Sequence, residues 1–180
     1  GPNGRIVAVL DAGRQRVTLR RFADGLLVGQ LAPNGAREGF RLLADVAFDA
    51  RGWLWIVARD GTLWRYDAAG KLKDRSALPG AGAEAVRALA VDEPLDGYVL
   101  TDAGRVWKFR GADGAALAAW DASGPLRPPT SPRLLGDLAV DPSGAVLVTD
   151  AGHGVVQRFV PDVPTGAEPP AAGGCEVDVD

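Results

Sequence analysis

Four short segments of the chain repeat the same order of apolar and polar positions: an aliphatic residue, a variable residue, a cation and an aromatic ring. The closing aromatic residues lie 44, 43 and 50 residues apart, and a turn that contains Gly precedes each segment. The segments are Leu19–Phe22, Leu63–Tyr66, Val106–Phe109 and Val156–Phe159. This spacing predicts a repeat protein with stacked units, because one unit of that size cannot bury its apolar surface alone.

Each repeat is predicted to contain up to four short strands. First strands are expected at 45–49, 88–92 and 137–141, each ending in Asp before a turn. Second strands, rich in β-branched and aromatic residues, are expected at 53–58, 98–101 and 145–149, with 6–10 as their counterpart at the start. The repeated segments are the third strands, and weaker fourth strands are expected at 26–31, 71–77 and 115–120. The first unit therefore lacks a first strand, and the last shows three clear strands.

The turn between the second and third strands has a nearly constant sequence. It reads Asp-Ala-Gly-Arg at 11–14 and 102–105, Arg-Asp-Gly-Thr at 59–62 and Asp-Ala-Gly-His at 150–153. We expect Gly to supply a positive φ and Asp to accept a hydrogen bond from the backbone ahead of it. Turn formation is the first interpretation of the recurring Asp residues, and a carboxylate ring around a divalent cation is the alternative.

The pattern predicts an all-β protein: a β-propeller, or an arc of one, with about four blades of four antiparallel strands. A closed four-bladed ring and an arc of a larger ring both fit four units in 180 residues. A β-solenoid or a two-sheet sandwich is the runner-up, although solenoid coils are shorter and sandwiches do not repeat their turns so regularly. The repeats are expected over 5–162, followed by a Pro, Ala and Gly-rich linker at 163–174 and a further strand or tail at 175–180, which favours the arc.

The last repeat resembles the NHL repeat, a propeller blade motif. The resemblance rests on Leu138–Gly144, Val146–Asp150, Gly152–His153 and Val155–Phe159, and it extends more weakly over residues 6–160. The Asn that NHL repeats place between the turn Gly and the His-like position is absent from every copy. The resemblance implies a ring that commonly has six blades, and a role as a protein-binding platform, an RNA reader or, occasionally, a lyase or lactonase.

Composition narrows the classes of function. The net charge of −3 argues against a general binder of nucleic acid or of anionic membranes. No run approaches the ~20 apolar residues of a membrane span, and the start of the chain lacks the apolar stretch of a secretory signal. The single cysteine, Cys175, allows no internal disulfide. The absence of Met, even at position 1, leads us to expect that the chain was processed or cut from a longer one.

One face of the predicted propeller collects turns and interblade connections that carry cations. The candidate partner-binding residues are Arg14, Arg41, Arg59, Arg87, Arg105, Arg133 and His153, together with Trp64 and Trp107 on the third strands. Trp and Arg dominate the hot spots of protein interfaces, whereas packing between adjacent blades is the other interpretation of the two tryptophans. Binding of RNA would need the aromatic rings and the cationic face together, and acidic residues nearly balance that face.

Catalytic chemistry has little support in the sequence. His153 is the only histidine and Asn3 and Asn34 are the only asparagines, so a His-rich metal site is not expected. We expect no cofactor and a non-enzymatic scaffold or protein-interaction module within a larger chain or assembly, such as a phage-tail-like particle. Its open sheet edges are expected to be covered by a protein partner, by the rest of its own chain or by another copy. A metal-dependent lactonase or lyase and an RNA-binding propeller are the alternatives.

Overall fold

The first half of the chain forms two antiparallel sheets. The computed structural model describes residues 5–31, 40–78, 83–122, 134–160 and 177–178. The first sheet contains β1 (Ile6–Asp11), β2 (Arg16–Arg21) and β3 (Leu27–Leu31). The second contains β4 (Leu43–Phe48), β5 (Leu54–Ala58), β6 (Thr62–Tyr66) and β7 (Leu72–Ala77). Among the described residues, the first sheet therefore has no strand that corresponds to β4 of the second.

The second half repeats this organisation. The third sheet contains β8 (Val86–Val91), β9 (Gly97–Thr101), β10 (Arg105–Phe109) and β11 (Ala116–Asp121). The fourth contains β12 (Leu135–Val140), β13 (Val146–Asp150), β14 (Val155–Phe159) and the two-residue β15 (Val177–Asp178). Consecutive strands pair within every sheet, so each sheet is one antiparallel meander. The predicted order of strands is confirmed.

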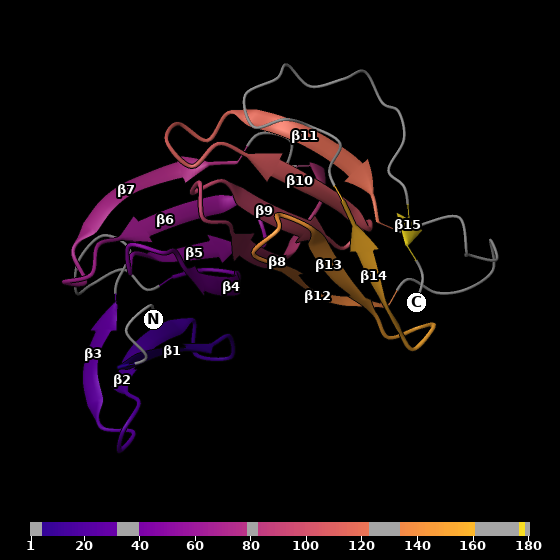
Figure 1. Ribbon diagram of the computed structural model, residues 1–180. Coiled ribbons are helices and arrows are strands. Elements are labelled where there is room, and N and C mark those ends of the chain that lie inside the picture. The colour runs from indigo at the N-terminus through magenta and orange to yellow at the C-terminus, as the bar shows by residue number, and fades with distance from the viewer. Residues whose placement is uncertain (1–4, 32–39, 79–82, 123–133, 161–176, 179–180) are drawn as a thin grey trace.

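The four sheets follow one another along a curved row, from the indigo first sheet to the orange last sheet (Figure 1). The first strands of the three later sheets lie next to one another, with β8 between β4 and β12. The later strands of each sheet lie farther out (Figure 1). This is the arrangement of blades in a β-propeller, so the predicted propeller arc is confirmed.

The first strand of each of the three later sheets, called the inner strand below, carries a β-bulge near its start. The register shifts between Leu43 and Asp45 in β4, between Val86 and Ala88 in β8, and between Leu135 and Leu138 in β12. The strands therefore begin two residues earlier than predicted. A bulge interrupts the alternation of inward and outward side chains, which is the signal that the prediction used.

The Asp that follows each inner strand closes the next turn. Asp49 accepts hydrogen bonds from the backbone amides of Arg51 and Trp53 at 2.9 and 3.0 Å. Asp141 accepts equivalent bonds from Ser143 and Ala145 at 2.8 and 3.0 Å. These contacts confirm that the recurring carboxylates form turns.

In the turn between the second and third strands of a repeat, the residue with a positive φ in the two middle sheets differs from that in the first and last sheets. Gly61 and Gly104 have φ values of 80° and 85°, as predicted. In the first and last sheets the positive φ lies instead at Gln15, 51°, and at Gly154, 67°. The predicted position of the positive φ was wrong in these two turns, because their strand pairs close around longer loops, 12–15 and 151–154. The predicted bonds to Asp are confirmed there, since Asp11 and Asp150 accept hydrogen bonds from the amides of Arg14 and His153.

The core consists of three apolar clusters, one between each pair of successive sheets. Side chains alternate along the strands, so Ile56 and Trp64 pack toward the first sheet while Val57 and Leu63 pack toward the third. The third and fourth sheets meet through a cluster that contains Val106. An inner blade therefore buries both faces of its sheet.

Candidate functional site

The predicted partner-binding cations lie mostly beside carboxylates of the same chain. The pairs are Arg14–Asp11, Arg59–Asp102, Arg87–Asp102, Arg105–Glu84 and His153–Asp150. Arg41 is exposed, and Arg133 lies outside the described residues. Because most of these cations have an acidic neighbour, this face presents little unbalanced positive charge to a partner.

Asp102 connects two blades. It accepts a hydrogen bond from the guanidinium of Arg59, which lies in the second sheet's β5–β6 turn. Its other carboxylate oxygen accepts a 2.9 Å bond from Nε of Arg87, on β8 of its own sheet. The sequence placed these three residues on one face, and the structure brings them together as an interblade ion-pair cluster.

His153 and Arg14 belong to turns of the outer sheets. The Nδ1 atom of His153 lies 2.8 Å from Oδ2 of Asp150, which also lies 3.4 Å from Nε2 of Gln157. Hydrogen bonds from the backbone and side chain of Arg14 hold the pKa of Asp11 below its ordinary value. Both residues therefore take part in local turn structure.

The two candidate tryptophans lie between blades. Trp64 is buried in the packing of the first and second sheets, where its ring meets Phe40 edge-on at a centroid distance of 5.2 Å. Trp107 is partly buried between the second and third sheets. Their Nε1 atoms are buried without a hydrogen-bond partner among the described residues. Interblade packing, one of the two interpretations that the sequence left open, accounts for both positions.

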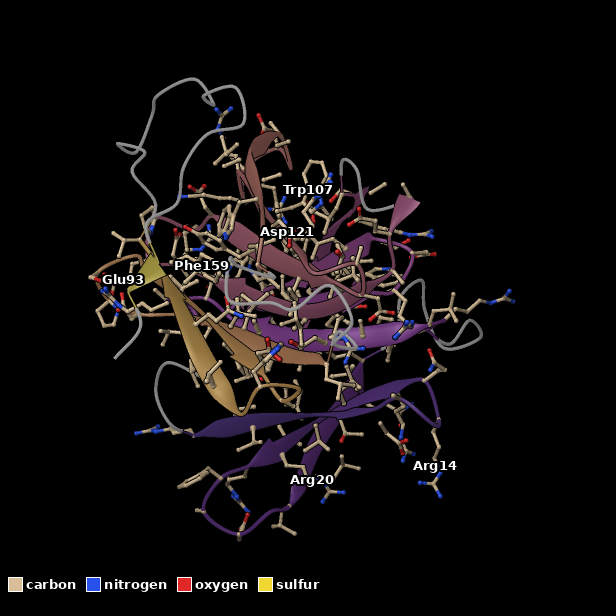
Figure 2. All side chains as sticks on the ribbon, turned by 90° about the vertical axis from the view of Figure 1, so that its right-hand side faces the viewer. Arg14, Arg20, Glu93, Trp107, Asp121 and Phe159 are labelled. Carbon is tan, nitrogen blue, oxygen red and sulfur yellow. The ribbon has the colours of Figure 1, made fainter. Side chains whose placement is uncertain are left out.

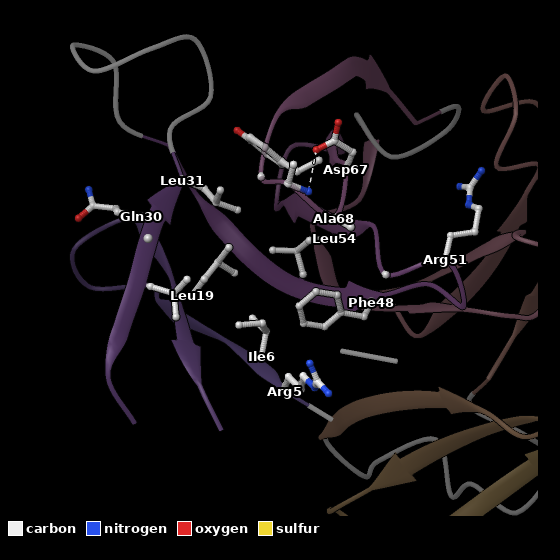
Figure 3. A pocket seen from close by; sticks show the side chains of 16 residues that line it. Arg5, Ile6, Leu19, Gln30, Leu31, Phe48, Arg51, Leu54, Asp67 and Ala68 are labelled. Atoms are coloured by element: carbon white, nitrogen blue, oxygen red, sulfur yellow. Dashed lines mark hydrogen bonds between the residues drawn. The ribbon is translucent and has the colours of Figure 1, made fainter. Parts of the chain in front are cut away.

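A cavity of about 500 Å³ lies between the first and second sheets (Figure 3). Ile6 and Leu19 line it from the first sheet, and Phe48 and Leu54 line it from the second. Arg51 lies at its margin (Figure 3). Since β1 corresponds to a second strand, no inner strand of the first sheet lies next to β4 in the described residues, and the two sheets leave this space between them. Its volume is within the usual range of ligand pockets.

Two features, a metal-ligand cluster and a membrane-spanning helix, bear on the kind of site formed by the described residues. Among them, no group of three or more His, Cys, Asp or Glu side chains is arranged to hold a metal ion. In the same part of the chain, no helix has both the length and the apolar character of a membrane span. The exposed surface that stands out chemically lies instead at the two ends of the arc.

The first end face is the side of the first sheet that points away from the second. It includes Val7, Val9, Arg20 and Phe22, with the buried Thr18 opposite Val9, and Arg20 points away from the molecule (Figure 2). Phe22 occupies the repeat position of Tyr66, Phe109 and Phe159. Those three rings are 1–2% exposed, whereas Phe22 is 71% exposed. The repeat aromatic is thus buried wherever a blade precedes it, and exposed where none does.

The last end face is the side of the fourth sheet that points away from the third. It consists of Leu147, Thr149, Val156 and Arg158. Val156 occupies the repeat position of Leu63 and Val106, which are 2% and 0% exposed, yet Val156 is 60% exposed. Both ends of the arc therefore present an apolar surface of the kind that the inner blades bury.

The sequence did not identify Phe22 and Val156 as functional candidates. Their residue types are those of core positions in the other repeats, so the pattern alone places them in the core. The signal that identifies them is their place in the first and last units, because the outer side of an end unit has no neighbouring blade in the described chain.

Comparison with known structures supports the propeller. The chain is similar to the structure of U3-55K, with 12% identity and a TM-score of 0.67 over 98% of this chain and 49% of that one. It is also similar to the β-propeller domain of Cps50 (Swd1) from Myceliophteria thermophila, with 13% identity and a TM-score of 0.52 over 90% of this chain and 64% of that one. No protein-family model and no curated protein sequence matches the chain.

These likenesses show the fold alone. The chain spans about half the length of the first structure and less than two thirds of the second. The resemblance of the repeats to NHL blades stays a prediction. The chain is an arc of a β-propeller, built of four consecutive sheets in the described residues.

Proposed function

We propose that the chain is a non-enzymatic propeller module that binds protein through the two end faces of its arc. The observation that carries the proposal is the exposure of Phe22, 71%, against the 1–2% of its three repeat equivalents. A partner that covers Phe22 buries a large apolar ring, and such burial is a main source of binding free energy. The resemblance to NHL repeats supports this role, because it implies a propeller that serves as a protein-binding platform.

The end faces are better suited to protein than the cationic turns are. The cations of the turns already have carboxylate partners, so burial of that face would break pairs or desolvate them. The exposed large apolar side chains on these faces are Val7, Val9, Leu27 and Phe22 at the first end and Val156 at the last end. Apolar patches of this kind mark interaction sites.

Site-specific photo-crosslinking tests the proposal. A photoreactive residue replaces Phe22 in one variant and Val156 in a second; in a matched control it replaces Glu93, an exposed residue in the turn of an inner blade. The variants are illuminated in an extract of expressing cells, and the adducts are mapped by mass spectrometry. We expect polypeptide adducts at positions 22 and 156 that excess unlabelled chain competes away. Equal adduct yields at position 93 would contradict the proposal.

A further inference from the structure

The chain carries both halves of one blade–blade interface. Within the arc, the side of a sheet that receives the next blade buries the aliphatic residue that opens the repeat, Leu63 or Val106. The side that packs on the preceding blade buries the aromatic that closes it, Tyr66 or Phe159. The last end face presents the first half of this interface through Val156, and the first end face presents the second half through Phe22.

A second position of the repeat supports the same correspondence. Val7 pairs with Arg20 as Ile56 pairs with Trp64 and Val148 pairs with Gln157, so the three aliphatic residues are equivalent. Ile56 and Val148 are fully buried against the preceding blade, while Val7 is exposed. The first end face therefore matches an interior blade face at two independent positions.

The third-position cations of the repeated segments do not oppose such a contact, whereas Arg20, on the first end face at the repeat position of Trp64, has to keep its 2.8 Å hydrogen bond to the carbonyl oxygen of Gly25 when it is covered. The cation of each repeated segment is paired within its own sheet: Arg21 with Asp24, Arg65 with Asp74, Lys108 with Asp92 and Asp96, and Arg158 with Asp141. Arg65 and Lys108 stay paired while largely buried between blades. Arg158, on the last end face, has its carboxylate in place before any partner arrives, so its burial leaves no unpaired charge.

We propose that the occupant of each end face is a second copy of this chain, joined head to tail. The inference rests on the proposed function and names its partner. The last end face of one copy packs on the first end face of the other, and the reciprocal contact closes a ring of two copies. Four sheets from each copy give eight blades, which is within the range of known propellers. One copy spans 49% of the propeller-like structure it matches over nearly its whole length, so two copies supply the length of one such structure.

The mass of the purified chain in solution tests the ring. Light scattering and native mass spectrometry are expected to give twice the 18.7 kDa of one chain. Val156→Asp and Phe22→Asp each place a charge in both contacts of the ring, and each is expected to raise the dissociation constant at least ~100-fold. Both side chains are exposed in one copy, so neither change disturbs the core, and circular dichroism checks this.

Mixing the two variants identifies the geometry. A Phe22→Asp copy keeps its last end face and a Val156→Asp copy keeps its first end face, so the mixture has one intact contact and is expected to form a mixed dimer. A contact between two last end faces would instead leave Phe22→Asp dimeric, and that result overturns the proposal. The matched control is Leu42→Asp, which changes an exposed aliphatic residue at φ 53°, away from both end faces, and is expected to leave the dimer intact.

The two experiments separate the two-copy ring from the broader proposal that the end faces bind protein. A chain that stays at 18.7 kDa up to ~100 µM, the range of weak self-association, overturns the two-copy ring. If positions 22 and 156 then crosslink to a different polypeptide, the proposed function stands with another partner. If they crosslink no more than position 93, both proposals fail.

Discussion

The backbone amide of Leu89 donates a 2.8 Å hydrogen bond to Oδ2 of Asp45, and this bond joins the inner strands of two neighbouring blades. Asp45 lies at the bulge of β4, and its other oxygen accepts a 2.7 Å bond from the amide of Val46. Burial raises the pKa of Asp45, the hydrogen bonds from Leu89 and Val46 oppose the rise, and the carboxylate of Asp137 adds to it. The carboxyl group that links the two blades is therefore one whose ionised form is destabilised by burial.

Stability is expected to depend on pH through Asp45. Its pKa is higher in the folded chain than the ordinary 3.8, so the folded state binds more protons than the unfolded state as pH rises above that value. The contribution of Asp45 to the free energy of unfolding therefore falls as pH rises. We predict that the unfolding free energy of the wild type, minus that of Asp45→Asn, is smaller near pH 7 than near pH 4. Urea titrations at both pH values measure it.

Asp113 gives a control of opposite sign. A hydrogen bond from the amide of Ala115 is the main cause that lowers the pKa of Asp113, and Arg110 lowers it further. A lowered pKa contributes stability above the unfolded value, which is lost as pH falls. The difference between the wild type and Asp113→Asn is thus expected to grow from pH 2.5 to pH 5, the range in which this carboxyl loses its proton. If the stability difference changed with pH in the same direction for Asp45 and Asp113, the opposite pKa shifts of these two residues would be contradicted.

The ion pair between Arg59 and Asp102 is predicted to couple the second and third blades. Both side chains are partly exposed, so the coupling free energy is expected to be about 0.5–1 kcal/mol, and smaller in 1 M NaCl. A double-mutant cycle with Arg59→Ala and Asp102→Ala measures it. The pair Arg110–Asp113, inside one turn, is the control for an ion pair that joins no blades. A salt-independent coupling at Arg59 would show that contacts other than charge produce the effect.

The fold could be predicted from the sequence because the informative signals are local. The aliphatic–variable–cation–aromatic segments and the turns with Asp and Gly set the strands, and four equivalent copies set the number of sheets. The bulge at Asp45 was missed because it depends on the pairing of β4 with β5. The sequence of so short a strand has the same pattern whether or not it contains a bulge. The positive φ of Gln15 was missed because loop length outweighed the identity of the Gly.

The candidate site depended on longer-range geometry. Trp64 is buried through contact with the preceding sheet, and the sequence left this role open beside partner binding. Phe22 has the residue type of a core position and owes its exposure entirely to its place in the first unit. Residue type therefore predicts which surfaces suit burial, whereas the assembled blades decide which of them are left open.

A glycine in β9 makes room for the repeat aromatic of β10. Gly97 lies opposite Phe109, and a Cβ added to Gly97 would lie 2.1 Å from the ring. Gly97→Ala is expected to cost about 1–3 kcal/mol by overpacking. In Gly29→Ala, the matched control in β3, the new Cβ meets no atom within 4 Å, and the change is expected to stay within ~0.5 kcal/mol. Chemical denaturation measures both.

Relief of the clash identifies its cause. Phe109→Leu removes the ring that the Cβ introduced by Gly97→Ala would meet, so the double variant Gly97→Ala, Phe109→Leu is expected to lose less stability than the sum of the two single variants. Additive losses would show that the cost arises in the backbone of β9 and not at the ring.

The same substitution at two equivalent repeat positions is predicted to have very different costs. Phe159 is 1% exposed in the cluster between the third and fourth sheets, so Phe159→Ala is expected to cost about 3–5 kcal/mol. Phe22 is 71% exposed, so Phe22→Ala is expected to change the unfolding free energy of the single chain by less than ~0.5 kcal/mol. Thermal and urea unfolding at a protein concentration low enough to keep the chain monomeric measure both.

Concentration separates folding from assembly at Phe22. If the end faces bind a second copy, the stability difference between the wild type and Phe22→Ala grows with protein concentration, because association stabilises the wild type alone. The difference for Phe159→Ala is already large in the dilute monomer, since Phe159 supports the chain before it assembles. A large loss for Phe22→Ala in the dilute monomer would place Phe22 in the core of the single chain and remove the first end face as a binding surface.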